Sequence, residues 1–197
     1  GFPVTVHRPS LVTASLGGRF VRRDITARAL GYMIRHGITV DTKNQISFVP
    51  VDVCAHNIVA LSFSKNEVTP VLHITSDGYH NAADICETIT RSHGYRFRQL
   101  SLPDFVAHAH THCGPEDDLF PLLSFFDRNT KRILAMGAKR YDSTSYRKAR
   151  DDEPLARQHP SDAATVSAIV TFLAREGLVP EPLAGSQTES RLAEATT

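Results

Sequence analysis

Residues 3–12, Pro-Val-Thr-Val-His-Arg-Pro-Ser-Leu-Val, decide the fold class of this chain. Within them, Val4-Thr5-Val6 is apolar or β-branched throughout and is followed by Pro9, as in a buried strand of a parallel sheet that is covered on both faces. Such a strand reaches a parallel neighbour only through a crossover of about a dozen residues or more. Few residues precede Val4, so we expect the chain to open in the middle of a fold, with the missing neighbours upstream of Gly1.

The composition indicates one domain with one sizeable core. The chain has 197 residues, of which 41% are hydrophobic and 22% charged, and its formal net charge is +1. A near-neutral chain has no basic excess that would favour nucleic acid. No run approaches the roughly 20 apolar residues of a membrane helix, and no signal segment opens the chain. We therefore expect a cytoplasmic protein that binds neither nucleic acid nor membrane.

Short strands alternate with longer helices along the chain. Asp24 predicts a helix start and Gly37 its end, and Gly94 and Gly177 predict two further helix ends. The predicted helices cover 24–36, 53–64, 81–93, a segment beginning at 101, and 161–177, and Asp52 is predicted to cap the second of them. After the first strand, the predicted strands cover 46–51, 71–74 and 95–100. We expect residues 1–182 to form the folded portion and residues 183–197 a flexible polar tail.

Three cysteines, Cys54, Cys86 and Cys113, are spread along the chain without any C-x-x-C pair. An odd number without that spacing disfavours both a disulfide framework and a zinc ribbon. Reduced, mostly buried thiols are the prediction.

The order of two motifs resembles the later half of an extended short-chain dehydrogenase/reductase. The first is the strand and loop 6–12, and the second is Phe-Val-Pro-Val-Asp-Val-Cys-Ala at 48–55. Three later segments are similar to the end of the thioester reductase domains of nonribosomal peptide and polyketide synthetases and carboxylic acid reductases. These segments are Tyr141-Asp142-Ser143-Thr144, the helix at 161–176, and Gly177-Leu178-Val179-Pro180. The resemblance implies an α/β fold: a mostly helical C-terminal substrate-binding lobe with a few short strands, whose Rossmann-type nucleotide-binding half is missing.

That family binds NADPH in an N-terminal Rossmann lobe and transfers hydride to a thioester on the phosphopantetheine arm of an acyl or peptidyl carrier protein. The product is an aldehyde or, after a second reduction, an alcohol. The resemblance therefore implies two partners for this chain, the carrier protein and the missing N-terminal reductase half.

The catalytic and nucleotide-binding signatures of that family are absent from the sequence. A dinucleotide fold needs a glycine-rich turn at a helix N-terminus, but the only glycine pair is Gly17-Gly18, after the wrong strand. The family's acid is a Tyr with a Lys four residues later, and none of the five tyrosines has a Lys at that spacing. The expectation is a chain without catalytic residues, inactive by itself.

The resemblance nevertheless assigns binding roles to individual residues. Arg8 would contact a phosphate through its guanidinium, and the neighbouring loop would pass the nicotinamide. The predicted cofactor-binding residues are Arg8, Pro9, Ser10 and Leu11; the predicted substrate-binding residues are Thr13, Ser15, Tyr32, Met33, Pro50 and Asp52; and Arg19, Arg22 and Arg23 are predicted to dock the carrier protein.

Each assignment has a structural alternative. Arg8 is equally suited to anchor a strand end, and Asp52 to cap a helix. Tyr32 and Met33, with Leu30 and Ile34, suit core packing as well as an acyl pocket. The arginine cluster is equally typical of a solvated charged face.

Other functions are compatible with parts of the sequence. His108, His112 and Cys113 have a spacing used in zinc sites, but no glutamate completes an H-E-x-x-H motif and Gly114-Pro115 follows at once. No metal site is therefore predicted. A non-catalytic module that docks a carrier protein remains an alternative, as does an extended reductase or epimerase that acts on a free metabolite such as a nucleotide sugar.

Overall fold

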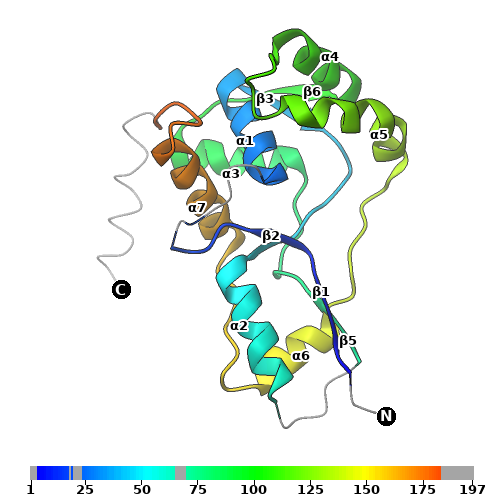
Figure 1. Cartoon of the computed structure of the whole chain (residues 1–197), viewed down its shortest axis with the longest axis vertical. Coiled ribbons are helices and arrows are strands. Elements are labelled where there is room, and N and C mark those ends of the chain that lie inside the picture. The colour runs from blue at the N-terminus through cyan, green and yellow to red at the C-terminus, as the bar shows by residue number, and fades with distance from the viewer. Residues whose placement is uncertain (1–3, 18, 20–23, 65–69, 183–197) are drawn as a thin grey trace.

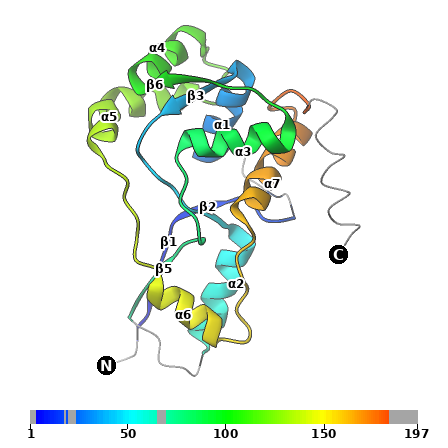
Figure 2. The same cartoon turned by 180° about the vertical axis from the view of Figure 1, so that it is seen from behind.

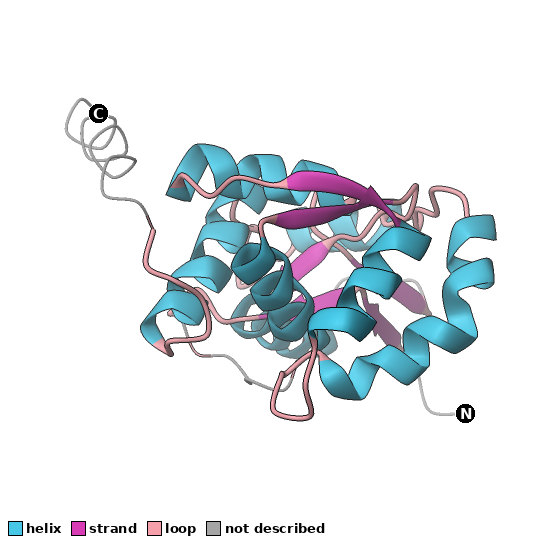
Figure 3. Cartoon of the chain, turned by 90° about the horizontal axis from the view of Figure 1, so that it is seen from above, coloured by secondary structure: helices cyan, strands magenta, loops and turns pink. Residues whose placement is uncertain are grey.

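The computed structural model describes residues 4–17, 19, 24–64 and 70–182. Its strands form three separate parallel pairs rather than one continuous sheet, and Figure 3 shows them as short ribbons among the helices. The pairs are β1 (Val6–Pro9) with β5 (Val71–Ile74), β2 (Leu11–Thr13) with β4 (Phe48–Pro50), and β3 (Ile38–Asp41) with β6 (Arg98–Ser101). The helices dominate, as the α/β lobe inferred from the sequence requires.

Two bodies of structure lie one above the other in Figures 1 and 2. The larger contains α1, α3, α4, α5 and α7 with the β3–β6 pair, and its hydrophobic core is extensive. The smaller contains α2, α6 and the β1–β5 pair around a second core. The helices are α1 (Ile25–His36), α2 (Val51–Ser62), α3 (Ala82–His93), α4 (Leu102–His112), α5 (Leu123–Ala135), α6 (Thr144–Asp152) and α7 (Asp162–Arg175), and a 3-10 turn covers Phe120–Leu122.

Local capping chemistry fixes most helix ends where the sequence predicts them. The Asp24 carboxylate accepts a hydrogen bond from the Thr26 amide at 2.7 Å, and Gly37 ends α1 with a left-handed φ of 58°. Asn81 and Asp84 form a reciprocal capping box at the start of α3, which satisfies two otherwise unpaired amides. The hydroxyl oxygens of Ser101 and Ser161 cap α4 and α7 by accepting hydrogen bonds from the Asp104 and Ala164 amides.

The predicted burial of Val4-Thr5-Val6 and the predicted capping role of Asp52 are both wrong. Val4, Thr5 and Val6 are exposed, and Val4 lies outside β1. The reason is that within the described residues β1 pairs on one edge only, so composition alone did not determine its burial. Asp52 does not cap α2, because the helix already begins at Val51 after Pro50, which places Asp52 in the first turn.

The predicted strand at 95–100 is displaced and a further strand was missed. β6 starts only at Arg98, and its partner β3 follows directly after Gly37. The missed strand buries Ile38 and Thr39, leaving Asp41 exposed at its end. No helix among the described residues is long and apolar enough to cross a membrane. The predicted tail at 183–197 lies outside the described residues.

Candidate functional site

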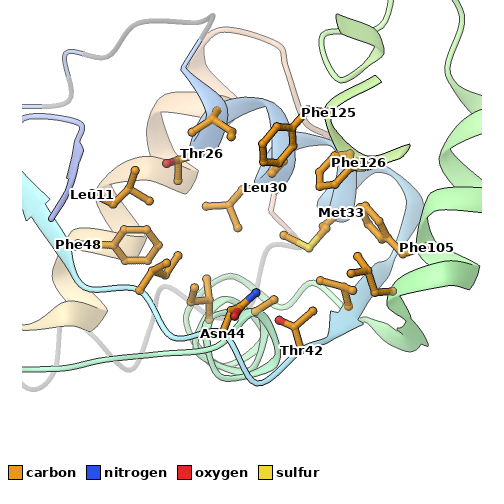
Figure 4. Close-up of a pocket in the computed structure, with 17 residues that line it drawn as sticks. Leu11, Thr26, Leu30, Met33, Thr42, Asn44, Phe48, Phe105, Phe125 and Phe126 are labelled. Atoms are coloured by element: carbon orange, nitrogen blue, oxygen red, sulfur yellow. The ribbon is translucent and has the colours of Figure 1, made fainter. Parts of the chain in front are cut away.

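An apolar cavity of about 400 Å³ lies between the helices of the larger body and the strand pair β2–β4 (Figure 4). Its volume falls within the roughly 300–1,000 Å³ typical of small-molecule sites. Helices α1, α3, α4 and α5 and the segment from β3 to β4 all contribute side chains. The lining residues are Leu11, Ile25, Thr26, Ala29, Leu30, Met33, Val40, Thr42, Asn44, Ile46, Phe48, Ala82, Ile85, Leu102, Phe105, Phe125 and Phe126.

The strand end of the cavity begins directly after the Arg-Pro motif. Leu11 of β2 is the cross-strand partner of Phe48 of β4, and both side chains line the cavity on the same side of Figure 4. Ser10, immediately before Leu11, donates its amide to the carbonyl group of Ile74 at 2.8 Å. This bond joins the end of the β1–β5 pair to the entry of the cavity wall. Ligands of parallel sheets characteristically bind beyond the carboxyl ends of strands.

Helix α1 supplies another wall through residues spaced three or four positions apart. Thr26, Ala29, Leu30 and Met33 all line the cavity. This spacing places side chains on one helix face. The structure therefore places Met33, predicted to contact substrate, in the cavity wall together with Leu11.

Three phenylalanines complete the lining of the cavity, and sequence analysis did not assign them to the site. Phe105 comes from α4, whereas Phe125 and Phe126 come from α5. Phe105 and Phe126 pack edge to face, with ring centroids 6.1 Å apart. Their sequence signal was only that of an ordinary apolar helix face, and nothing local indicated that α5 would close a pocket begun by Leu11.

Four of the other predicted substrate residues lie in the loop after β2 or in the elements next to it. Thr13 and Pro50 are buried cross-strand partners, and neither lines the cavity. The Asp52 carboxylate accepts hydrogen bonds from the Leu16 amide at 3.2 and 3.3 Å. The Ser15 hydroxyl accepts one from the Arg19 amide at 3.0 Å. These bonds give the loop a defined path beside the first turn of α2.

The residues predicted to contact a cofactor sit at the exposed end of β1. Arg8 and Pro9 are exposed, while Ser10 is partly buried. Arg8 is the cross-strand partner of His73.

Tyr32 points away from the cavity, into a group of histidines. Its side chain is fully buried and its hydroxyl group lies 2.7 Å from Nδ1 of His108. The rings of His36, His108 and His112 lie against one another, with centroid separations from 4.0 to 5.8 Å. Burial lowers the pKa of His36 and of His108, and it raises the pKa of Tyr32.

Two of these histidines, His108 and His112, were considered together with Cys113 as zinc ligands in the sequence analysis. Within the described ranges, no three His, Cys, Asp or Glu side chains form a group that could hold a metal ion. Burial raises the pKa of Cys113 to about 11, so its thiol is protonated near neutral pH. All three cysteines are free and buried, which confirms the prediction of reduced thiols.

Of the three arginines predicted to dock a carrier protein, only Arg19 is described, and it is exposed. Arg22 and Arg23 lie outside the described residues.

Comparisons with known proteins agree on the architecture. Residues 1–58 match the protein family described as male sterility protein, an NAD-binding family. The terminal R domain from the myxalamid PKS-NRPS biosynthetic pathway is similar over 93% of this chain and 46% of that chain, with 24% identity and a TM-score of 0.76. No curated protein matches the sequence.

Two further solved structures share the fold. A thiolation-reductase di-domain from an archaeal non-ribosomal peptide synthetase is 15% identical, with a TM-score of 0.65, over 90% of this chain and 37% of that chain. UDP-glucuronic acid 4-epimerase from Bacillus cereus is 14% identical, with a TM-score of 0.55, over 89% of this chain and 46% of that chain. The chain thus spans less than half the length of each of these structures. It has the fold of the C-terminal part of an extended short-chain dehydrogenase/reductase, as its sequence predicted, and it is similar in structure to these two reductase domains.

Proposed function

We propose that the chain is the substrate-binding part of an NADPH-dependent thioester reductase that releases an acyl or peptidyl chain from a carrier protein. The observation that carries this proposal is the position of the apolar cavity. Its wall begins at Leu11, directly after the Arg8-Pro9-Ser10 end of a parallel strand pair. That end is where a nicotinamide ring and a substrate chain would meet in this fold.

In the proposed reaction, hydride passes from NADPH to the carbonyl carbon of the thioester. The carbon–sulfur bond then breaks, the phosphopantetheine thiol leaves with a proton, and the products are an aldehyde and NADP⁺. A second hydride and proton would give the alcohol. NADPH would be bound mainly by a Rossmann portion outside these 197 residues, with Arg8 near a phosphate and Pro9, Ser10 and Leu11 beside the nicotinamide.

The remaining assignments combine the sequence predictions with the contacts that the described residues make. Met33 would contact the substrate chain directly, since it lines the cavity. Tyr32 would position α1 through His108, and Thr13, Ser15, Pro50 and Asp52 would hold the adjacent loop. Arg19, Arg22 and Arg23 would attract the acidic surface and phosphate of the carrier protein.

Two other functions give different expectations. A module that only docks carrier proteins would have no use for a preformed apolar cavity, and it would not distinguish loaded from unloaded carrier. An epimerase of the kind in the Bacillus cereus structure would bind a nucleotide sugar. The cavity is a poor match for that ligand, because no charged residue lines it.

Titration of the chain with phosphopantetheinylated carrier protein, loaded with an acyl group or unloaded, separates these functions. We expect tighter binding of the loaded form and no oxidation of NADPH by the chain alone. Reversing the charges of Arg19, Arg22 and Arg23 should weaken binding of both forms, whereas reversing the exposed Arg128, Lys131 and Arg132 of α5 should not. Equal affinity for loaded and unloaded carrier would favour the docking module, and binding of a UDP-sugar would favour the epimerase.

A further inference from the structure

Resting on the proposed function, we infer that the substrate chain is predominantly hydrocarbon, an aliphatic or aryl-aliphatic acyl group, rather than a polar or charged peptidyl chain. Four phenylalanines, a methionine and several branched aliphatic residues line the cavity. Aromatic and methionine side chains adapt well to varied apolar ligands. The lining therefore stabilises a ligand mainly by removing its apolar surface from water.

Two of the three polar residues of the lining have side-chain oxygens that are not available to a ligand. Thr26, Thr42 and Asn44 are the three polar members of the set. The Thr26 hydroxyl oxygen and the Asn44 side-chain oxygen are both buried and without a hydrogen-bond partner. Neither oxygen is exposed in the cavity. The Asn44 amide nitrogen lies 3.5 Å from the carbonyl group of Ile133. A peptidyl chain placed in this cavity would exchange its many bonds to water for at most those of the Thr42 hydroxyl and the Asn44 amide nitrogen, which costs binding free energy.

No charged residue lines the cavity, so an ionised group on the substrate would have no counter-charge there. The nearest predicted acid, Asp52, is turned toward the Leu16 amide and is not part of the lining. A terminal carboxylate or ammonium group should therefore be rejected.

The exposure of the lining residues differs around the cavity. Ile25 and Phe125, at the starts of α1 and α5, are 44% and 45% exposed, whereas Phe48, Ile85 and Leu102 are at most 3% exposed. Figure 4 shows Phe125 and Phe48 on different sides of the space. The exposed pair forms part of the rim of the cavity, and the buried trio forms part of its inner wall.

The volume limits the length of the chain. An engineered cavity of about 150 Å³ accommodates benzene, so by proportion a cavity of about 400 Å³ has room for about sixteen carbon atoms. Affinity should rise by at most about fourfold per added methylene until this space is filled.

Isothermal titration calorimetry of the 197-residue chain with acyl N-acetylcysteamine thioesters tests the inference. The probes are hexanoyl, octanoyl and decanoyl thioesters, a decanoyl analogue with a terminal carboxylate, a seryl-asparaginyl dipeptidyl thioester, and 1-decanol, which has no thioester. We expect affinity to increase from hexanoyl to decanoyl. The carboxylate and the dipeptide should bind at least tenfold more weakly than decanoyl.

A cavity-filling variant and a matched control locate the binding. Ala29 lines the cavity on α1, whereas Ala107 is exposed on α4 and does not. Ala29→Phe should weaken decanoyl binding at least tenfold, and Ala107→Phe should leave it unchanged. Thermal unfolding checks the fold of each variant, and Ala82→Phe, which fills the cavity from α3, replaces Ala29→Phe if that variant does not fold.

The outcomes separate the ligand class from the proposed function. If the dipeptidyl or carboxylate probe binds as tightly as the decanoyl thioester, or more tightly, the hydrocarbon assignment is overturned. The proposed thioester function still stands in that case if Ala29→Phe abolishes the binding. Decanoyl affinity that a folded Ala29→Phe variant retains also overturns the assignment. Binding of 1-decanol in the cavity without binding of any thioester supports an apolar site but contradicts the proposed function.

Discussion

The hydroxyl group of Tyr32 lies 2.7 Å from Nδ1 of His108, which joins the buried face of α1 to α4. Burial raises the pKa of Tyr32 and lowers that of His108, which favours the uncharged form of both groups. The two helices also supply neighbouring parts of the cavity lining, through Met33 and Phe105 (Figure 4). The bond therefore helps to hold these two parts of the candidate substrate site together.

Tyr32→Phe removes that bond while it retains the ring. We expect a loss of about 1 kcal/mol in the free energy of unfolding, measured by urea denaturation. The matched control is Tyr141→Phe, because Tyr141 is 58% exposed and its ring stacks on His73. An equal loss in both variants would show that the Tyr32 hydroxyl contributes nothing specific.

The histidine group should make stability depend on pH. Burial is the main cause that lowers the pKa of His36 and of His108 in the folded chain. Arg35 and His112 lower the pKa of His36 further, whereas Asp117 raises it. As the pH falls below about 6.5, the unfolded chain binds protons first, so the free energy of unfolding should decrease. Above that pH, these histidines should not change the free energy of unfolding further.

Urea denaturation at pH 7.5 and pH 5.5 measures this dependence. A His36→Gln/His108→Gln variant should lose less stability between the two pH values than the parent chain. His110→Gln is the control, since His110 lies outside the ring group and faces Asp127 at 2.7 Å. A parent chain that is as stable at pH 5.5 as at pH 7.5 would contradict the prediction.

Asp52 should order the loop after β2 rather than the helix that follows. Its carboxylate accepts hydrogen bonds from the Leu16 amide and lies in the first turn of α2, where a negative charge is favourable. Asp52→Ala should lower the free energy of unfolding by about 1 kcal/mol and accelerate hydrogen exchange of the Leu16 amide. Asp52→Asn retains an acceptor and should protect that amide better than Ala does; identical exchange in all three chains would refute the role.

Asn57 holds the long connection between α6 and α7 onto α2. Its side chain donates to the Tyr146 hydroxyl at 2.8 Å and to the Arg157 carbonyl group at 2.9 Å, and it accepts from the Arg157 amide at 2.7 Å. Because Asn57 is fully buried, Asn57→Ala should cost about 3 kcal/mol. Asn129→Ala, which removes one bond within α5, should cost less than about 0.5 kcal/mol. Comparable losses in the two variants would contradict this account.

The exposed β1–β5 pair should favour self-association. Val6 and its cross-strand partner Val71 are 42% and 37% exposed on a two-stranded sheet. Val6→Lys should reduce the fraction of associated chains in sedimentation velocity experiments, because charged residues on strand edges oppose pairing. Val59→Lys on α2 is the control, as Val59 is 57% exposed on a helix whose backbone is already paired. A monomeric parent chain would refute the expectation.

The helix boundaries could be predicted from the sequence because their causes are local. Asp24 and Gly37, or Asn81 and Gly94, act on amides and carbonyl groups within a few residues. The exposure of Val4 and Val6 could not be predicted, since burial depends on what covers a strand and not on the strand's own composition. Motif order was enough to identify the fold class, because it reflects the whole domain.

The candidate site was only half accessible to sequence reasoning. Leu11 and Met33 follow from the strand motif and the α1 helix face, and both lie in the cavity wall. Phe125 and Phe126 come from a helix far along the chain, and only the packing of α5 against α4 brings them to Leu11. Asn57 was missed because its partners, Tyr146 and Arg157, are distant in sequence.

The three parallel strand pairs have a consequence for how the chain acquires this structure. Each pair joins distant segments: Val6 with Val71, Leu11 with Phe48, and Ile38 with Arg98. The described strands contain no hairpin that could form early from neighbouring residues. Closing such large loops costs entropy before any contact compensates for it. The helices should therefore assemble well before the strands register, and the substrate cavity, which depends on both, should be among the last features to form.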